Sequence, residues 1–307
     1  MNTIVPKKYK TLNCIENCIA NVCDANAIDF RPMFLYSWDI GYDTSKNTIG
    51  ERLHYRFSSK INFTDYMQIS EEYMHTAFVD GHLNFNVVNE VDSKDRICLI
   101  ETDSYYCSWN AAYNKYHYPH YYLLLQNSYT DRDFIIIDSF SSLQMIKCDS
   151  TTLKNIKKCY SIIQKNCGFS FPITNIKKKF IDFVAMNTRN NVYEQINMFG
   201  SDLMLLESIY DLSPQIVDIP NSHIIRRLSY LSNARYNTAL LMNYINLDSS
   251  FIERMNLIHR RWESLKNYFI KVLVTKNIQM IPLAKEMINV LATEENDLAR
   301  IISKEIN

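Results

Sequence analysis

The sequence predicts an α+β protein whose first half mixes helices with strands and whose second half is all helical. Two observations predict this. Short runs rich in aromatic and β-branched residues recur before about residue 170, as in RICLIETDSYY and RDFIIIDSF. After the segment GFSFP, apolar residues recur at three- and four-residue spacing, which is the period of a helix. We therefore expect two domains, residues 1–168 and residues 169–307.

Local patterns predict the elements of the first half. Cys14, Cys18 and Val22 share one face at four-residue spacing, which predicts a helix over 14–25. A second helix is expected at about 151–166. Strands are expected at about 96–106, 120–126 and 132–140, and the loop NSYTDRD makes the last two a hairpin.

The second half shows helical faces punctuated by proline. Two apolar faces are Leu203, Leu206, Ile209 and Tyr210, and Ile258, Trp262, Leu265 and Phe269. Pro214, Pro220 and Pro282 are expected near helix ends because proline lacks the N–H that a helix interior needs.

Composition excludes several classes of function. The 307 residues include 33 Lys and Arg against 33 Asp and Glu, a net charge of +0, which argues against bulk attraction to nucleic acid or membrane. No stretch approaches the roughly 20 apolar residues of a spanning helix, and the start of the chain lacks the apolar run of a signal peptide. We expect a soluble cytoplasmic protein with no nucleic-acid or membrane partner.

Cysteine and glycine usage narrows the chemistry further. None of the eight cysteines forms a CxxC pair, so we expect no metal site and mostly buried thiols. The five glycines match neither a phosphate loop nor a dinucleotide fingerprint. Any bond-forming reaction therefore needs a substrate that arrives already activated, and we expect no bound cofactor.

Three residues could form a nucleophilic site. Cys14 opens the first predicted helix, where unpaired N–H groups and the helix dipole favour a thiolate. His120 begins one strand and Asp138 ends the next, so a hairpin could bring the acid beside the imidazole. His117 is the rival base and Cys18 the rival thiol, although Cys18 is expected to pack beneath Cys14.

Four segments carry a resemblance to a known family: NCIEN around Cys14, MFLYSW at 33–38, ETDSYYCSWNAAYNKYHYPHYYLLL at 101–125, and IIIDSF. Over residues 10–165 the chain resembles the papain-like domain of the acyltransferase family typified by the butirosin biosynthesis acyltransferase. That family is itself similar to the C39-type cysteine peptidases. Within it, the chain is most similar to an amide synthase of thiotemplated antibiotic biosynthesis.

The resemblance implies a papain-like fold and an acyl-transfer reaction. Members take acyl groups from the phosphopantetheine thioester of an acyl- or peptidyl-carrier protein and pass them to a small amine. Phosphopantetheine belongs to the carrier, so no cofactor of the enzyme is implied. By the resemblance, Cys14 is the nucleophile, His120 the general base and Asp138 its orienting partner.

One position departs from the resemblance. The related peptidases place an oxyanion-hole glutamine six residues before the cysteine, where this chain has Lys8. The Cys14 backbone N–H, with Asn13 or another nearby amide, is the expected substitute. The departure also weakens the peptidase interpretation.

Other residues are candidates for binding. Asp103 could hold a cationic amine, with Glu101 and Glu16 as alternatives, while Tyr105, Tyr106 and Trp109 could line an aromatic channel that excludes water. The candidates for docking an acidic carrier protein are Arg226, Arg227, Arg260 and Arg261. Each of these could equally be an ordinary core or surface residue.

Two further functions remain open at this stage. One is a C39-type cysteine peptidase that trims a leader peptide. The other is a non-catalytic, partner-binding protein that has kept a papain-like core. The presence of all three candidate residues, Cys14, His120 and Asp138, argues against the second.

Overall fold

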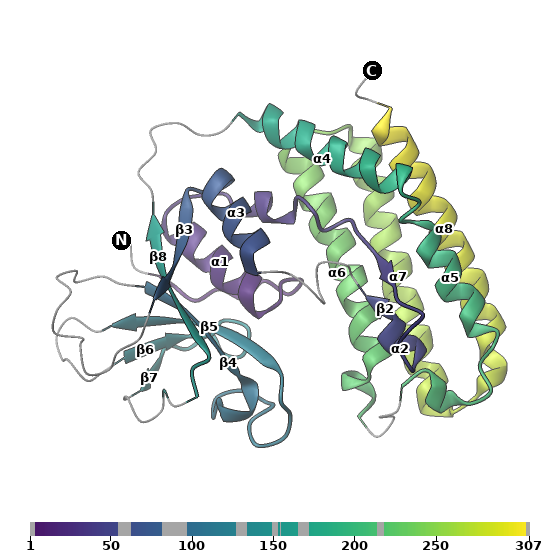
Figure 1. Ribbon diagram of the computed structural model, residues 1–307, viewed down its shortest axis with the longest axis horizontal. Helices are drawn as coiled ribbons and strands as arrows, with labels where there is room; N and C mark the ends of the chain where they lie inside the picture. The colour runs from purple at the N-terminus through teal and green to yellow at the C-terminus, as the bar shows by residue number, and fades with distance from the viewer. Residues whose placement is uncertain are drawn as a thin grey trace. The chain divides into compact units, whose positions relative to one another are not determined.

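The structure is a computed structural model that describes residues 4–54, 63–81, 97–126, 134–148, 153, 155–164, 172–213 and 218–304. Within these residues it is an α+β protein with eight α-helices and a six-stranded antiparallel sheet (Figure 1). No helix in the described part of the chain has the length and apolar character needed to cross a membrane.

The chain forms two compact units. Unit 1 comprises Met1–Met33 and Tyr66–Ser170, and unit 2 comprises Phe34–Asp65 and Phe171–Asn307. The sequence predicted a single boundary after residue 168. The structure divides differently, because the segment that follows Met33 packs with the helices of unit 2.

Unit 1 combines a six-stranded sheet with two helices (Figure 1). The strand order is β3-β8-β4-β5-β6-β7, and α1 packs beside β5. The elements are α1 (Cys14–Ala25), α3 (Phe63–Tyr73), β3 (Thr76–Gly81), β4 (Ile97–Asp103), β5 (Pro119–Gln126), β6 (Phe134–Ile137), β7 (Ile146–Cys148) and β8 (Lys158–Gln164). The predictions of a helix over 14–25 and of an antiparallel pairing between the strands near 120 and 135 are confirmed. The loop NSYTDRD lies outside the described residues.

The helix predicted at 151–166 is wrong. Within the described part of that range the chain forms strand β8, which pairs with β3 on one side and β4 on the other. Apolar residues at Leu153, Ile156, Tyr160 and Ile163 imitate helical spacing. Hydrogen bonding to two distant strands outweighs that local pattern, because a strand between two neighbours satisfies its backbone groups on both edges.

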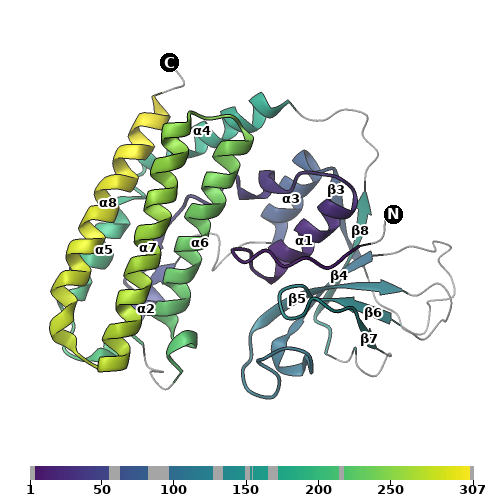
Figure 2. The same ribbon diagram turned by 180° about the vertical axis from the view of Figure 1, so that it is seen from behind.

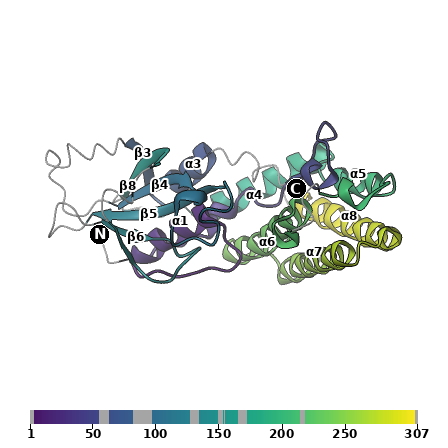
Figure 3. The same cartoon turned by 90° about the horizontal axis from the view of Figure 1, so that it is seen from below.

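Unit 2 is built from long helices that pack side by side (Figures 2 and 3). They are α4 (Ile173–Arg189), α5 (Glu194–Leu203), α6 (His223–Tyr244), α7 (Ser249–Thr275) and α8 (Ile281–Ser303). The face predicted from Ile258 to Phe269 is buried in α7, as expected. The face predicted from Leu203 to Tyr210 is wrong, because α5 ends at Leu203 and a short 3-10 turn occupies Ile209–Asp211.

The segment that precedes α3 crosses the helices of unit 2 and contains β1 (Gly41–Tyr42), α2 (Ile49–Arg52) and β2 (Leu53–His54). Hydrogen bonds tie it to the helices: Ser37 Oγ lies 2.9 Å from Thr238 Oγ1, and the Gly50 N–H donates to the Leu212 carbonyl at 3.1 Å. A Cβ at Gly50 would lie 2.6 Å from that carbonyl oxygen, so only glycine allows the close approach.

A buried ion pair anchors this segment. The Arg235 guanidinium makes two hydrogen bonds to Glu295, at 2.9 and 2.7 Å, and both side chains are fully buried. Arg235 also donates to the Asp39 carbonyl at 2.9 Å. Trp38 and Trp262 each donate an indole N–H to the Glu295 carboxylate, at 3.0 and 2.6 Å. Every charge is therefore compensated, which a buried pair requires.

We predict that Glu295→Gln lowers the free energy of unfolding by about 3–5 kcal/mol, because the buried Arg235 then loses its charged partner. Urea unfolding followed by the fluorescence of Trp38 and Trp262 measures this. Glu294→Gln is the matched control: its partner Arg261 is partly exposed, and surface pairs contribute about 0–1 kcal/mol. Equal losses in the two variants would contradict the prediction.

Candidate active site

His120 and Asp138 form a buried hydrogen-bonded pair in unit 1. His120 is the second residue of β5, and Asp138 directly follows β6. Leu123 pairs with Ile137, which brings Asp138 to the level of Tyr122 and onto the face that Tyr122 shares with His120. His120 Nε2 lies 2.7 Å from Asp138 Oδ2, and both side chains are at most 4% exposed.

Two further donors hold the Asp138 carboxylate. Trp109 Nε1 donates to Oδ2 at 2.8 Å, and the Ser141 N–H donates to Oδ1 at 3.2 Å. Burial would raise the pKa of Asp138, but the hydrogen bonds from His120, Ser141 and Trp109 and the charge of His120 outweigh it and lower the pKa. The carboxylate therefore stays ionised inside the protein.

The environment of His120 favours its charged form. Burial alone would lower the pKa of His120, yet hydrogen bonds to Asp138 and Cys14 and the charges of those groups raise it to about 10. Because Asp138 occupies Nε2, Nδ1 is the ring nitrogen left for a second partner. The Asp138 carboxylate therefore pairs with an imidazole whose protonated form is favoured.

Cys14 is the first residue of α1 and is only partly buried. A capping box begins the helix: the Glu16 N–H donates to Asn13 Oδ1, and the Asn13 N–H donates to Glu16 Oε2, both at 2.9 Å. These bonds fix the helix start, so the thiol lies in the positive end of the helix dipole. The side-chain oxygen of Asn13 accepts a hydrogen bond in this cap. A role for Asn13 in an oxyanion hole stays a prediction.

The rival thiol Cys18 is buried one turn further along α1. Burial, together with the charges of Asp138 and Cys14, raises the pKa of Cys18 well above that of an ordinary thiol. This agrees with the expectation that Cys18 packs beneath Cys14.

Two buried asparagines on α1 hold the chain that precedes it. The Asn21 side chain accepts from the Lys7 N–H at 2.7 Å and donates to the Lys7 carbonyl at 2.9 Å. Asn17 accepts from the Tyr9 N–H at 3.0 Å. Asn21 Nδ2 also donates to Ser139 Oγ at 2.8 Å, which ties α1 to the residue after Asp138. One helix thus positions both the candidate nucleophile, Cys14, and the loop that follows Asp138.

The loop between β4 and β5 contributes Trp109 and its neighbour Asn110. Asn110 Nδ2 donates to Ser141 Oγ at 2.9 Å and lies 3.5 Å from His120 Nε2. Trp109 donates its indole N–H to the acid of the pair, and contact of Trp109 with a substrate stays a prediction. Sequence reasoning singled out Trp109 for substrate contact and missed Asn17, Asn21, Asn110 and Ser141.

The rival base His117 belongs to a second, exposed pair. His117 Nδ1 lies 3.0 Å from Asp103 Oδ2, and its ring stacks on Tyr105 with centroids 4.2 Å apart. Burial would raise the pKa of Asp103, but hydrogen bonds from the Tyr105 N–H and His117 lower it. Asp103 is thus already engaged by protein groups, while Tyr106 is exposed. Contact of Asp103, Tyr105 and Tyr106 with a substrate stays a prediction.

The four arginines predicted to dock a carrier all lie in unit 2. Arg261 pairs with Glu294 at 2.8 Å, and Arg226 lies 3.4 Å from the Tyr230 hydroxyl. Burial lowers the pKa of Arg227, which is partly buried, whereas Arg260 is exposed. Among the described residues, no cluster of three or more His, Cys, Asp or Glu side chains could hold a metal ion.

Comparisons with known proteins add no family assignment. Neither the models of known protein families nor the curated protein sequences contain a match to this chain.

We predict that Asp138→Asn lowers the pKa of His120 from about 10, because the variant removes the carboxylate charge that favours the imidazolium. Titration of the imidazole by NMR measures this. A histidine whose pKa is raised on folding stabilises the fold fully below its unfolded pKa of about 6.5 and loses that contribution as pH rises through about 10. The stability advantage of the wild type over the variant should shrink in that range.

Asp103→Asn is the matched control for this titration, since it removes the carboxylate of the exposed pair with His117 and leaves Asp138 in place. The pKa of His120 should be unchanged in the control. A pKa that stays near 10 in Asp138→Asn would contradict the assignment of the buried pair.

Proposed function

We propose that unit 1 is a papain-like catalytic domain and that the chain is a carrier-protein-dependent acyltransferase that forms amides. The observation that carries the proposal is the buried His120–Asp138 pair, together with a cysteine at a helix N-terminus whose thiol contributes to the raised pKa of that histidine. A cysteine so placed is activated as a nucleophile by its base, and the base is oriented by its acid. The sequence resemblance to the butirosin-type acyltransferases selects acyl transfer among the reactions open to such a site.

The first step is a thioester exchange. The Cys14 thiolate attacks the carbonyl carbon of the acyl thioester, a new S–C bond forms, and the bond between that carbon and the carrier's sulfur breaks. The leaving thiolate takes a proton from the His120 imidazolium. One thioester replaces another, so the exchange is near thermoneutral and needs no ATP.

The second step forms the amide. An amine attacks the acyl carbon on Cys14, neutral His120 removes a proton from the nitrogen, and Cys14 departs as thiolate. General-base assistance of this kind contributes about 10²- to 10⁴-fold to the rate. Asp138 binds His120 through Nε2, which leaves Nδ1 to exchange protons with the reacting groups.

A peptidase of the C39 type would pass through the same S-acyl intermediate but would use water in the second step. Lys8 stands at the position of the peptidases' oxyanion glutamine, which favours the transferase. A non-catalytic role leaves unexplained why a carboxylate with three donors is buried beside a partly exposed thiol.

We predict that mixing the protein with an acyl-loaded carrier protein adds the mass of the acyl group to Cys14 and that an added amine discharges it as an amide. Intact-protein mass spectrometry measures both events. Cys14→Ala should gain no mass. Cys18→Ala, which changes the buried thiol one turn away, should still be acylated.

The outcomes separate the candidate functions. Discharge by water alone, with no amide product, would indicate a hydrolase. Acylation that persists in Cys14→Ala would contradict the assignment of the nucleophile.

A further inference from the structure

Exposed apolar side chains gather on the connection between β6 and β7. Phe140 is 42% exposed, Leu143 is 60% exposed and Met145 is 41% exposed. Single exposed apolar residues are common, but three within six positions form a patch of the kind that binds a partner. We call Phe140, Leu143 and Met145 the β6–β7 surface.

This surface begins two residues after the catalytic acid. The Phe140 ring lies 6.4 Å from the His120 ring, centroid to centroid. The carbonyl of Asp138 accepts from the N–H groups of both Ser141 and Ser142, at 3.0 and 2.7 Å. The turn is therefore held by the same residue that orients the base, and a partner seated on Phe140 would lie beside the reacting groups.

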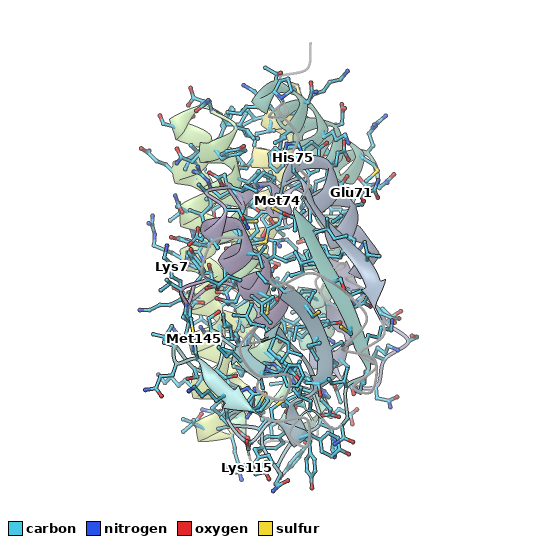
Figure 4. The ribbon with its side chains drawn as sticks, turned by 90° about the vertical axis from the view of Figure 1, so that its left-hand side faces the viewer. Lys7, Glu71, Met74, His75, Lys115 and Met145 are labelled. Carbon is cyan, nitrogen blue, oxygen red and sulfur yellow. The ribbon has the colours of Figure 1, made fainter. Side chains whose placement is uncertain are left out.

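A lysine extends the β6–β7 surface. Lys8 Nζ donates to the Phe140 carbonyl at 2.7 Å and lies 5.5 Å from the centre of the Phe140 ring. The chain around Lys8 is held on α1 by the amides of Asn17 and Asn21. Figure 4 labels Lys7 of this segment and Met145 of the β6–β7 surface on the same side of the view.

The charge around the surface is positive. Lys7 is offset by Asp24 at 2.8 Å, but among the described residues Lys8 and Lys10 form no ion pair. Neither residues 4–12 nor residues 139–148 contain an acidic side chain among these, and residues 139–148 add Lys147. Since the whole chain has a net charge of +0, this excess of positive charge is local.

We propose that the β6–β7 surface and Lys8 dock the carrier protein, an acidic partner with exposed apolar side chains. The inference rests on the proposed acyl transfer. A carrier brings its thioester on a flexible arm and needs a landing surface outside the reacting groups, and this one is both apolar and positively charged. Electrostatic complementarity speeds such encounters, while buried apolar contacts supply the affinity.

The location differs from the arginines that the sequence suggested. Arg261 is already paired with Glu294, and Arg227 is partly buried. Lys8 has no carboxylate partner among the described residues. It donates a hydrogen bond to the carbonyl of Phe140, whose ring lies near that of His120.

The test combines a binding and a rate measurement. The docking variant is Lys8→Glu with Leu143→Asp. The matched control is Lys271→Glu with Val274→Asp, because both of these residues are exposed on α7 and neither is a candidate for docking. Binding of fluorescent acidic holo-acyl carrier protein is measured in a Cys14→Ala background, so that it is independent of the reaction. Acylation of Cys14 is then compared for two donors, acyl-carrier and free acyl-pantetheine.

We expect the docking variant to weaken carrier binding by at least about tenfold and to slow acylation by acyl-carrier to a similar extent. Acylation by free acyl-pantetheine should be unchanged, and the control should behave as the wild type. The affinity of the wild-type surface should also fall as salt is raised.

Three results would overturn the proposal. One is that the carrier does not bind the Cys14→Ala protein at all, and another is that the control variant loses as much carrier binding as the docking variant. The third is that the docking variant loses as much acylation with free acyl-pantetheine as with acyl-carrier. If the carrier binds through this surface but neither donor acylates Cys14, the docking proposal stands and the proposed acyl transfer fails.

Discussion

The hydrogen bond between His120 and Asp138 is the interaction on which unit 1 depends. A buried carboxylate is costly unless its charge and lone pairs are compensated. Here the compensation comes from His120, Trp109 and the Ser141 N–H. Each donor comes from a different part of the chain, so satisfying one carboxylate fixes the start of β5, the loop before it and the turn after β6.

The candidate nucleophile, Cys14, is the first residue of α1, which packs beside β5. Asn21 bonds both to the backbone of Lys7 and to Ser139, the neighbour of Asp138. The helix, the chain before it and the acid-bearing turn therefore form one hydrogen-bonded assembly. For the proposed reaction, such an assembly would hold the Cys14 thiol and His120 in place before a substrate binds. Unit 2 also contains a buried carboxylate that is satisfied by donors from distant parts of the chain. There Glu295 accepts hydrogen bonds from Arg235, Trp38 and Trp262.

Local pattern predicted α1, the β5–β6 pair and the placement of Asp138 beside His120, because each rests on residues close together in sequence. It failed where partners are distant. The local sequence pattern of β8 predicts a helix, and only its pairing with β3 and β4 makes it a strand. The attachment of the 34–54 segment depends on Glu295, far along the chain. Asn13, which caps α1, and Asn17 and Asn21 within it recur every four residues. This polar stripe could have indicated that another segment binds the helix, but it does not identify the segment.

The central claim is that Cys14 is the activated thiol of this chain, and alkylation by iodoacetamide at neutral pH tests it most directly. Peptide mass spectrometry follows each cysteine, with Cys98 as the internal reference because it is also partly exposed. Cys14 should be labelled first, and His120→Ala should slow its labelling without changing that of Cys98. Labelling of Cys14 no faster than Cys98, or unaffected by loss of His120, would contradict the claim.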